Sequence, residues 1–431
     1  MADHPRPPRR ADPASRSRHL PPRGPGDAGH APDRHRSSRS GCRRAVTRHR
    51  VTNRRDRAAL TVVIGVVLAA ASGCSAATPS PVPPSGAATV SATPTATPAT
   101  QWWRATDEVS TLATGLTAPW SVVPLPSGGA LISQRDDGMI LELQADGTLR
   151  DVGAVAGVVS GGESGLHGLA LTERDGEVLL YAYFGAQDDN RVVRMPLVGE
   201  PGSLTLGDPE EILTGIPRAS THNGGRIAFG PDGYLYVTTG DAQLRDAAQD
   251  PGALGGKILR VTGDGDPAPG NPWDNAAYSI GHRNVQGLAW TSDGTLWASE
   301  FGQNTWDELN RIEAGGNYGW PLVEGEGGQA EFIDPVAVWT TSEASPSGIA
   351  ARDGTVFIAG LRGERLWAVD TGGGAAASDP VAALAGQQGR LRDVVIAPDG
   401  SLWILTSNTD GRGSPRSEDD LLLRVELAPA G

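Results

Sequence analysis

His222 is the residue of this 431-residue chain whose neighbours best suit proton transfer. It stands in the segment Ser-Thr-His-Asn-Gly-Gly, whose two glycines predict a tight turn that projects a side chain. Asp241 follows nineteen residues later, after the next apolar runs, so antiparallel folding would return its carboxylate beside the imidazole. A carboxylate that fixes the imidazole tautomer makes a histidine a general base, although such a pair also occurs as a purely structural contact.

Two other histidines, His167 and His282, also stand at the starts of apolar runs, and the remaining five lie within the first 50 residues. Together with His222 they make three imidazoles, the number that some catalytic zinc sites use. Zinc binding requires all three rings to point at one atom, so it stays open as an alternative.

The segment Gly-His-Arg-Asn-Val-Gln-Gly at 281–287 places Arg283 and Asn284 before another apolar run. In the same repeat, Ser-Glu-Phe-Gly-Gln-Asn-Thr-Trp-Asp-Glu at 299–308 contains an irregular turn with a glycine. Such a turn exposes backbone carbonyls and carboxylates, which are the ligands that Ca²⁺ prefers. The sequence therefore offers a candidate site for a hard cation.

Three arginines, Arg362, Arg390 and Arg392, stand at the ends of later apolar runs. Arg390 and Arg392 are two residues apart, so on a strand they face the same side. Residues 74–431 carry 21 basic and 45 acidic groups, a background against which these cations stand out. They indicate an anionic ligand with several carboxylates; the alternative is pairing with nearby acids such as Asp393 and Glu364.

Six repeats organise the chain between residues 101 and 431. Each has an apolar run, a turn with Asp-Gly or Gly-Gly, and further alternating runs. Asp-Gly between two alternating runs predicts a β-hairpin, and a period of 46 to 61 residues is that of a four-stranded blade. The sequence predicts an all-β, six-bladed β-propeller with four antiparallel strands per blade; an open array of β-sandwiches is the alternative. The turn glycines are Gly129, Gly176, Gly233, Gly294, Gly354 and Gly400.

Closure of such a ring requires its two ends to pair. We expect a strand around residues 108–112 to pair with the unit at 421–427. The starts of the innermost strands then converge on the mouth of the central channel, where the three histidines would lie.

The first 73 residues hold 16 Arg against 5 Asp and read as a basic leader. Three arginines at 54, 55 and 57 precede a charge-free apolar run, 58–72, which fits a signal peptide and is too short to span a bilayer comfortably. The run ends in Ala-Ser-Gly-Cys, which resembles a bacterial lipobox in which Cys74 carries the lipid. An ordinary secretory signal is the alternative. Translation is expected to begin nearer Val46 or Val51, so that residues 1–45 are not made.

Residues 74–100 are almost purely Ala, Thr, Pro and Ser after Cys74, a composition typical of a flexible tether. We therefore expect an exported domain, 101–431, held on the outer face of the bacterial cytoplasmic membrane by its lipid anchor only. The net charge of −24 beyond residue 73 disfavours nucleic acid and anionic membrane as partners. This domain has no cysteine, so its core alone must stabilise it.

Taken together, these segments resemble the soluble glucose dehydrogenase family that uses pyrroloquinoline quinone (PQQ), and most closely its aldose sugar dehydrogenase branch. The likeness follows the family's order over roughly 105–428. It implies an enzyme that oxidises aldose sugars at C1 to lactones, with PQQ as hydride acceptor and Ca²⁺ as Lewis acid. The matching segments are 221–227, 281–289, 302–308, 316–321 and 390–394.

The resemblance implies catalytic roles for three residues. His222 matches the general base that takes the proton of the anomeric hydroxyl, and Asp241 matches its orienting carboxylate. Arg283 and Asn284 match residues beside the quinone oxygens, where Arg283 would stabilise developing charge.

Further cofactor and metal contacts follow from the same resemblance. Arg362, Arg390 and Arg392 match cations that grip PQQ, while Trp339 and Thr341 match the wall that flanks its ring. For metals, the matches are the carbonyls of Gly302 and Gln303 for a catalytic Ca²⁺, and Glu308, the carbonyl of Tyr318 and either Glu324 or Glu326 for a second, structural Ca²⁺.

Two positions bear on the substrate. Glu163 stands where glucose-type members have an amide, and Thr221 where they have a substrate-contacting acid. His167 stands where the family has an aliphatic residue, and its role is unassigned. The large insertions of dimeric members are absent, which favours a monomer, and the electron acceptor stays unknown. Two other functions remain open: a non-catalytic extracellular propeller that binds sugar or protein, and a Ca²⁺-dependent propeller lactonase.

Overall fold

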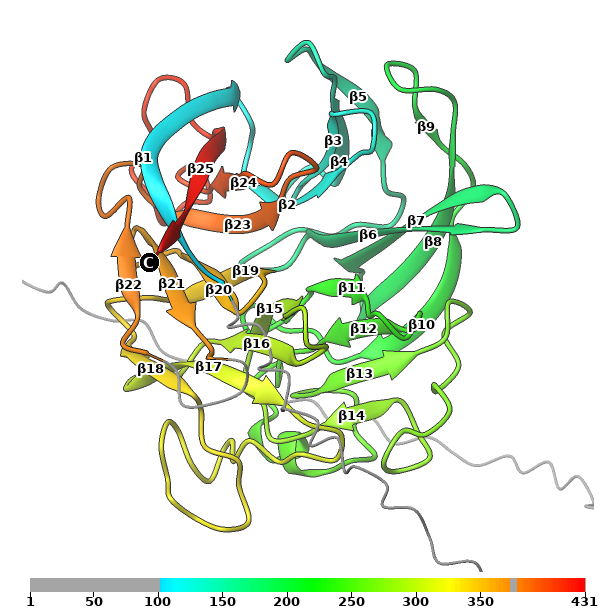
Figure 1. Ribbon diagram of the computed structural model, residues 1–431. Coiled ribbons are helices and arrows are strands. Elements are labelled where there is room, and N and C mark those ends of the chain that lie inside the picture. Colours follow the sequence, from blue (N-terminus) through cyan, green and yellow to red (C-terminus); the bar gives the residue numbers. More distant parts are fainter. Residues whose placement is uncertain (1–100, 373–377, 431) are drawn as a thin grey trace, which may run out of the picture. The chain divides into compact units, whose positions relative to one another are not determined.

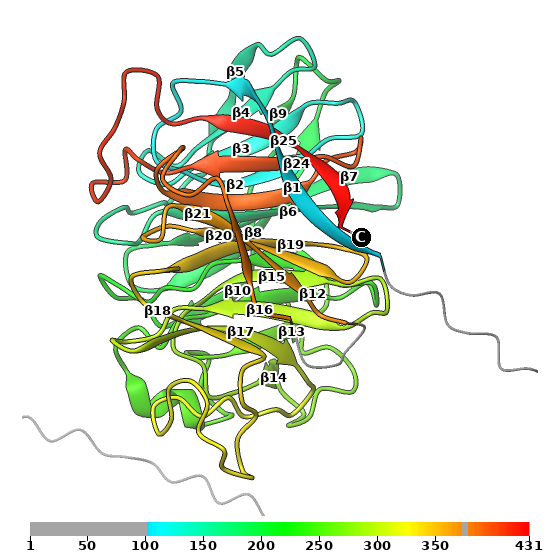
Figure 2. The ribbon, with the colours of Figure 1, turned by 60° about the vertical axis from the view of Figure 1, so that its left-hand side comes forward.

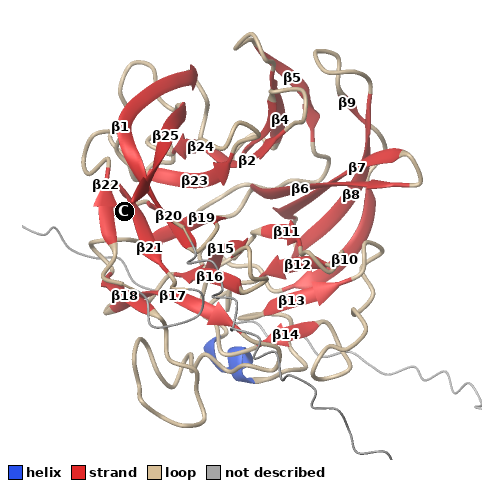
Figure 3. Ribbon diagram, viewed as in Figure 1, coloured by secondary structure: helices blue, strands red, loops and turns tan. Residues whose placement is uncertain are grey.

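The computed structural model describes residues 101–372 and 378–430. They form six antiparallel sheets of four main strands each, arranged as blades around a ring (Figure 1). Strands dominate, with a short 3₁₀ helix at one edge (Figure 3). The predicted all-β six-bladed propeller is confirmed. The predicted leader, Cys74 and the tether lie outside the described residues.

The first three blades follow one another along the chain. Blade 1 consists of β2 (Pro119–Pro124), β3 (Ala130–Gln134), β4 (Met139–Leu143) and β5 (Leu149–Ala154). Blade 2 consists of β6 (Leu166–Arg174), β7 (Glu177–Gly185), β8 (Asn190–Val198) and β10 (Glu210–Ile216), with the short β9 (Thr205–Leu206) paired to β8. Blade 3 consists of β11 (Ile227–Phe229), β12 (Leu235–Thr238), β13 (Ile258–Val261) and β14 (Ala277–Ser279), with the 3₁₀ helix η1 (Arg245–Gln249) after β12.

The last three blades complete the ring. Blade 4 consists of β15 (Val285–Trp290), β16 (Leu296–Glu300), β17 (Trp306–Ile312) and β18 (Ala337–Thr340). Blade 5 consists of β19 (Pro346–Arg352), β20 (Thr355–Gly360), β21 (Arg365–Asp370) and β22 (Val381–Ala383). Blade 6 consists of β23 (Leu391–Ile396), β24 (Leu402–Thr406), β25 (Leu422–Ala430) and β1 (Trp102–Ala113).

The six predicted turns join the first and second strands of the six blades. In blade 3, for example, Asp232 and Gly233 connect β11 to β12, and Gly233 adopts a φ of 80° that favours glycine. Five of the six second strands are buried along their whole length because both of their faces pack against neighbouring blades; the sixth, β7, is exposed at its first two residues. This explains why they appear in the sequence as nearly continuous apolar runs.

One hydrophobic cluster fills each of the six interfaces between neighbouring blades. Between blades 2 and 3, Tyr181 and Tyr183 pack with Val237 and Leu259. Within this core-stabilised ring, the loops at the ends of the inner strands are free to carry functional groups.

Pairing between β1 and β25 closes the ring, as predicted. These strands run side by side in two views (Figures 1 and 2), with Val109 opposite Val425 and Thr111 opposite Leu423. Within the part of the chain that the structure describes, no helix is both long and apolar enough to cross a membrane.

Candidate active site

Loops that lead into the first strands of five blades carry the candidate site. Glu163 precedes β6, His222 precedes β11, Arg283 precedes β15, Ser345 precedes β19 and Arg390 precedes β23. Inner strands of a propeller converge, so residues far apart in the sequence meet at one end of the channel.

His222 and Asp241 form the predicted pair. The Nδ1 of His222 lies 2.7 Å from Oδ1 of Asp241, whose side chain is fully buried. The guanidinium of Arg283 donates to Nε2 of His222 at 2.8 Å. Because the arginine can only donate, Nε2 must hold the lone pair and Nδ1 the proton. This is the tautomer of a general base that is oriented by a carboxylate.

Two further donors fix Asp241. The indole Nε1 of Trp320 donates to Oδ2 at 2.9 Å, and the backbone N–H of Gln243 donates to Oδ1 at 2.8 Å. Burial raises the pKa of Asp241, but the hydrogen bonds from His222 and Gln243 leave that pKa below its usual value. Asp241 is therefore a charged, immobile anchor for the imidazole.

The backbone around His222 is tightly constrained. His222 adopts a left-handed φ of 60°, which is uncommon for a residue with a side chain. Gly240 packs directly against it, since a Cβ there would lie 1.9 Å from the His222 carbonyl oxygen. The side chain of Asn284 accepts a hydrogen bond from the N–H of Gly224 at 3.0 Å. Asn284 thus braces the turn that presents His222.

Arg283 connects this pair to the predicted cation-binding turn. Its Nη1 donates to the carbonyls of Phe301 and Gly302 at 3.0 and 2.7 Å. Its own N–H donates to the carboxylate of Glu300. Burial lowers the pKa of Arg283, while the charges of Asp241 and Glu300 oppose that shift.

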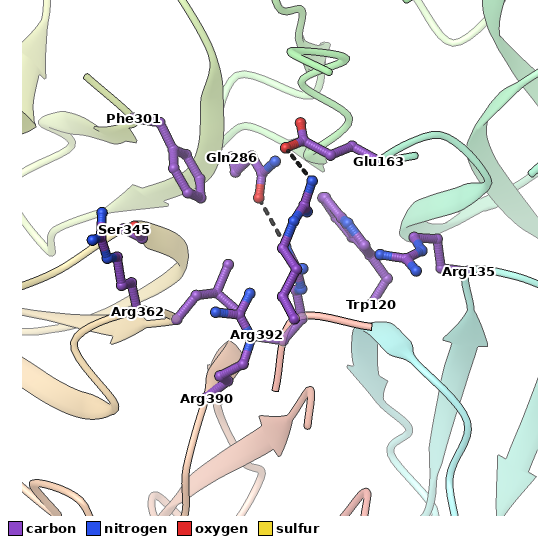
Figure 4. Close-up of a pocket in the computed structure, with 11 residues that line it drawn as sticks. Trp120, Arg135, Glu163, Gln286, Phe301, Ser345, Arg362, Arg390 and Arg392 are labelled. Carbon is purple, nitrogen blue, oxygen red and sulfur yellow. Dashed lines mark hydrogen bonds and ion pairs between the residues drawn. The ribbon is translucent and has the colours of Figure 1, made fainter. Parts of the chain in front are cut away.

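An adjoining cavity of about 390 Å³ is lined by guanidinium groups (Figure 4). Arg362 lies on the side of Phe301, and Arg135 lies on the side of Trp120. Among its lining residues, Glu163 is the one that carries a carboxylate. The full lining set is Trp120, Arg135, Glu163, Gln286, Phe301, Ser345, Leu361, Arg362, Arg390, Arg392 and Arg412.

Arg390 and Arg392 face the same side, as predicted, and both approach Asp410. The Nη2 atoms of Arg390 and Arg392 lie 2.9 and 3.6 Å from Oδ2 of Asp410. The alternative partner Asp393 pairs with Arg226 instead, at 2.9 Å. Among the described residues the buried Nε atoms of Arg390 and Arg392 meet no hydrogen-bond acceptor. Burial also lowers the pKa of Arg392 to about 9, so an anion in the cavity would favour its charged form.

The two predicted substrate residues lie near His222. Glu163 accepts a hydrogen bond from the N–H of His222 at 2.9 Å and pairs with Arg412 at 3.1 Å. It therefore bridges the histidine and the arginine-lined cavity. The hydroxyl of Thr221 accepts a hydrogen bond from Gln243 at 3.0 Å.

The predicted wall residues Trp339 and Thr341 do not line this cavity. Trp339 is buried in the cluster between blades 4 and 5, with its ring 5.8 Å from that of Trp367. The apolar lining comes instead from Trp120, Phe301 and Leu361. The loop that contains Thr341 reaches the cavity four residues later.

The predicted metal residues lie beside Arg283. Gly302 and Gln303 belong to the turn between β16 and β17. Glu308 and Tyr318 line a separate small cavity of about 10 Å³, together with Glu300 and Glu324. Burial and the charge of Glu300 raise the pKa of Glu308 to about 8, which marks a buried carboxylate that would gain from a cation. Glu326, the other candidate ligand, is exposed.

The three histidines occupy three different environments. The His167 ring stacks on Trp120 at 4.9 Å, and its Nε2 donates to the carbonyl of Glu163. His282 is buried between Ser279 and Glu300. Across residues 101–372 and 378–430, no three His, Cys, Asp or Glu side chains are grouped to hold a metal ion. The three rings lie in separate environments, so the geometry gives the zinc alternative no support.

Residues 116–423 match the model of the glucose/sorbosone dehydrogenase family. The chain belongs to this family. A PQQ-bound aldose sugar dehydrogenase from Streptomyces coelicolor is 51% identical, with a TM-score of 0.72 over 75% of this chain and 100% of that one. An aldose sugar dehydrogenase of Escherichia coli is 29% identical over 353 residues, which is 73% of this chain and 94% of that protein. An uncharacterised protein from Synechocystis is 32% identical over 352 residues, covering 69% and 83% of the two chains.

Several residues of the site in this family member were not predicted from the sequence. Arg135 follows β3 as Arg362 follows β20, each after the second strand of its blade. Aligning the repeats would therefore have identified Arg135. Trp320 lies in the matching segment 316–321, but the resemblance assigned it no role. Arg412 and Asp410 lie in an irregular loop between β24 and β25, where no periodic pattern indicates which side chains point inward.

Proposed function

We propose that this member of the glucose/sorbosone dehydrogenase family is a PQQ- and Ca²⁺-dependent dehydrogenase that oxidises aldose sugars at C1 to lactones. The observation that carries the proposal is the arginine-lined cavity adjoining the oriented His222–Asp241 pair. The Streptomyces coelicolor relative, which is PQQ-bound, supports it.

The donors in the cavity fit a cofactor with three carboxylates. Arg362, Arg390 and Arg392 would hold it, and the buried Nε atoms of the latter two are donors in need of acceptors. Phe301 and Leu361 offer apolar surface to a planar ring. When bound, PQQ would supply the acceptor for the hydride that leaves C1 of the sugar.

His222 would take the proton of the anomeric hydroxyl at Nε2. Arg283 covers that atom in the present structure, so the hydroxyl must replace the guanidinium there. Asp241 and Trp320 keep the ring in the required tautomer and orientation. With the hydroxyl proton on His222, and with the hydride acceptor that PQQ would supply at C1, the aldose would become its lactone. Arg283, released from Nε2, would lie close enough to stabilise the charge that develops during hydride transfer.

The carbonyls of Gly302 and Gln303 would hold the catalytic Ca²⁺. The Gly302 carbonyl already faces a cationic group, Arg283, which fits a position suited to positive charge. When bound, Ca²⁺ would act as a Lewis acid toward the cofactor. Glu308 and the carbonyl of Tyr318 would hold a second, structural Ca²⁺, for which the small cavity and the raised pKa of Glu308 provide support.

Glu163 and Thr221 would contact the sugar. Glu163 accepts a hydrogen bond from the N–H of His222, and Thr221, the residue before His222, accepts one from the side chain of Gln243. Arg412 pairs with Glu163 at the side of the cavity, so the two would bind the substrate together.

The location of the enzyme is a further part of the proposal. A lipid on Cys74 would anchor it on the outer face of the cytoplasmic membrane as a monomer, with the tether separating the propeller from the lipid. Metabolic labelling with radioactive palmitate should mark the wild-type protein and not Cys74→Ser. Equal labelling of both would contradict the anchor.

Reconstitution tests the enzymatic proposal. PQQ and CaCl₂ are added to the purified full chain, and reduction of an artificial acceptor dye is followed across a panel of aldoses. We expect sugar-dependent reduction that requires both additions. Absence of both PQQ uptake and turnover would favour the non-catalytic binding propeller.

A further inference from the structure

The turn between β16 and β17 has its backbone donors bound by two carboxylates. A single oxygen of Glu324, Oε1, lies within 2.7 to 3.2 Å of four consecutive backbone nitrogens, those of residues 303–306. The preceding N–H, that of Gly302, donates to Asp307 at 2.9 Å. Five successive N–H groups therefore point at carboxylate oxygens, an arrangement that resembles an anion-binding nest.

This arrangement decides where the carbonyls of the turn point. In a planar trans peptide the N–H of one residue and the C=O of the residue before it point in opposite directions. Because the N–H groups of residues 303 and 304 point toward Glu324, the carbonyls of Gly302 and Gln303 must point away from it. The contact between the Gly302 carbonyl and Arg283 at 2.7 Å agrees with this direction.

Close packing shows that the turn is wrapped around the carboxylate. A Cβ added at Gly302 would lie 2.7 Å from Oε1 of Glu324 and 1.7 Å from the carbonyl oxygen of Trp306. Only glycine fits there without moving the turn. At the other end, Asp307 also accepts a hydrogen bond from Ser345 at 2.6 Å, which ties the turn to the loop before β19.

The charge of Glu324 is suited to this task. Its carboxylate accepts all four backbone hydrogen bonds through the one oxygen Oε1. A charged acceptor forms shorter and stronger hydrogen bonds than a neutral one. The carboxylate can thus hold several amides that would otherwise be free to rotate.

We propose that Glu324 is a positioning residue that directs the carbonyls of Gly302 and Gln303 toward the catalytic Ca²⁺. The proposal rests on the proposed function, since it assumes that these carbonyls hold the metal. It gives Glu324 a task different from that of a ligand for the structural Ca²⁺, because Oε1 is committed to the backbone of the turn.

Hydrogen exchange of the metal-free full chain tests the geometry without any activity. Glu324→Ala removes the shared acceptor, so amide exchange in residues 303–306 should accelerate by about tenfold or more. Glu331→Ala, which alters an exposed glutamate of the following loop, serves as the matched control and should leave exchange in the turn unchanged. Equal exchange in Glu324→Ala and wild type would overturn the proposal.

A calcium titration tests the consequence. The full chain is mixed with PQQ, and the absorbance of bound PQQ is followed as CaCl₂ is added. Glu324→Ala should require at least about tenfold more Ca²⁺ for half-maximal uptake, while Glu331→Ala should match wild type. Glu324→Gln, which keeps an acceptor without the charge, should fall between them and replaces the alanine variant if that variant does not fold.

The outcomes separate the two proposals. If wild type takes up PQQ and Ca²⁺ normally and both Glu324 variants need no more Ca²⁺ than wild type, the positioning role is wrong. If wild type takes up no PQQ, the proposed function is wrong, and the positioning role toward Ca²⁺ falls with it. The exchange result would then still report whether Glu324 orders the turn.

Discussion

Around His222 and Arg283 the neighbouring ionisable groups are carboxylates, whereas the adjoining cavity is lined by five guanidinium groups. On the His222 side, Asp241, Glu300 and Glu324 each accept hydrogen bonds from backbone or side-chain donors of the protein itself. On the cavity side, Asp410 is a buried carboxylate shared by Arg390 and Arg392.

The difference indicates two kinds of task. The carboxylates accept hydrogen bonds from the protein itself. They therefore orient an imidazole, the backbone N–H of Arg283 and the turn between β16 and β17. Two of the arginines, Arg390 and Arg392, retain buried Nε donors without acceptors, which costs free energy unless a ligand supplies the acceptors. One half is therefore suited to positioning reacting groups, and the other to binding an anion. Variants in the two halves should accordingly affect different measured quantities.

The largest expected effect comes from His222→Ala. Removal of a general base should lower kcat by roughly 10²–10⁴-fold. The affinity for PQQ should stay within about threefold of wild type, because His222 does not line the arginine cavity. Steady-state dye reduction with glucose or maltose measures the first quantity and PQQ absorbance the second. Near-wild-type dye reduction would remove His222 from the mechanism.

Arg362→Gln should have the opposite signature. A charge-assisted hydrogen bond contributes roughly 1.5–3 kcal/mol, so the Kd for PQQ should rise by about 10- to 100-fold. At saturating PQQ, kcat should be little changed. Arg362 is exposed, so its replacement should not destabilise the fold. Arg104→Gln, on the exposed part of β1, is the matched control and should bind PQQ as wild type does.

A smaller effect is expected from Trp320→Phe. This substitution removes the indole donor to Asp241 and leaves most of the aromatic surface. Loss of one hydrogen bond of this kind should lower kcat by about 2- to 10-fold with little change in the Kd for PQQ. An equal loss in PQQ affinity would mean that Trp320 affects both the His222 side and the arginine-lined cavity, which would contradict the division of the site.

The effect that is smallest at neutral pH concerns stability. Burial lowers the pKa of His167 from 6.5 to about 3, and the charges of Arg135, Arg392 and Arg226 act in the same direction. Between these values the unfolded chain binds a proton that the folded chain excludes, so His167 makes stability fall as the pH falls from 6.5 to 3.

Titration of His167 changes the free energy of unfolding by at most about 1.4 kcal/mol per pH unit. Urea denaturation at several pH values should give a shallower dependence for His167→Phe than for wild type. Identical dependence in both proteins would show that His167 does not titrate as proposed.

The fold could be predicted because its signals are local and repeated. Each Asp-Gly turn with its flanking runs specifies one hairpin, and six copies specify a ring. Even the closure of β1 on β25 followed from the need to pair the two ends. The extra strand β9 pairs with β8 of its own blade, and the repeated local pattern of the chain contains no signal for it.

The candidate site was predictable where a residue adjoins a turn of defined geometry. His222 and Asp241 end two strands of one hairpin, so their spacing already places them together. The four amide contacts of Glu324 depend on the path of a loop that begins after β17, and its sequence does not encode that path through any periodic pattern. Trp339 lies in the core although its motif matches a cofactor wall, because its strand β18 packs against blade 5.

Parallel titration of PQQ into wild type, His222→Ala and Arg362→Gln, each with saturating CaCl₂ and followed by dye reduction with glucose, tests the division of the site most directly. The prediction is that His222→Ala binds PQQ like wild type but turns over at least a hundredfold more slowly, while Arg362→Gln binds PQQ weakly and turns over normally once saturated. The account would be contradicted if wild type did not bind PQQ, or if both variants lost binding and turnover in the same proportion.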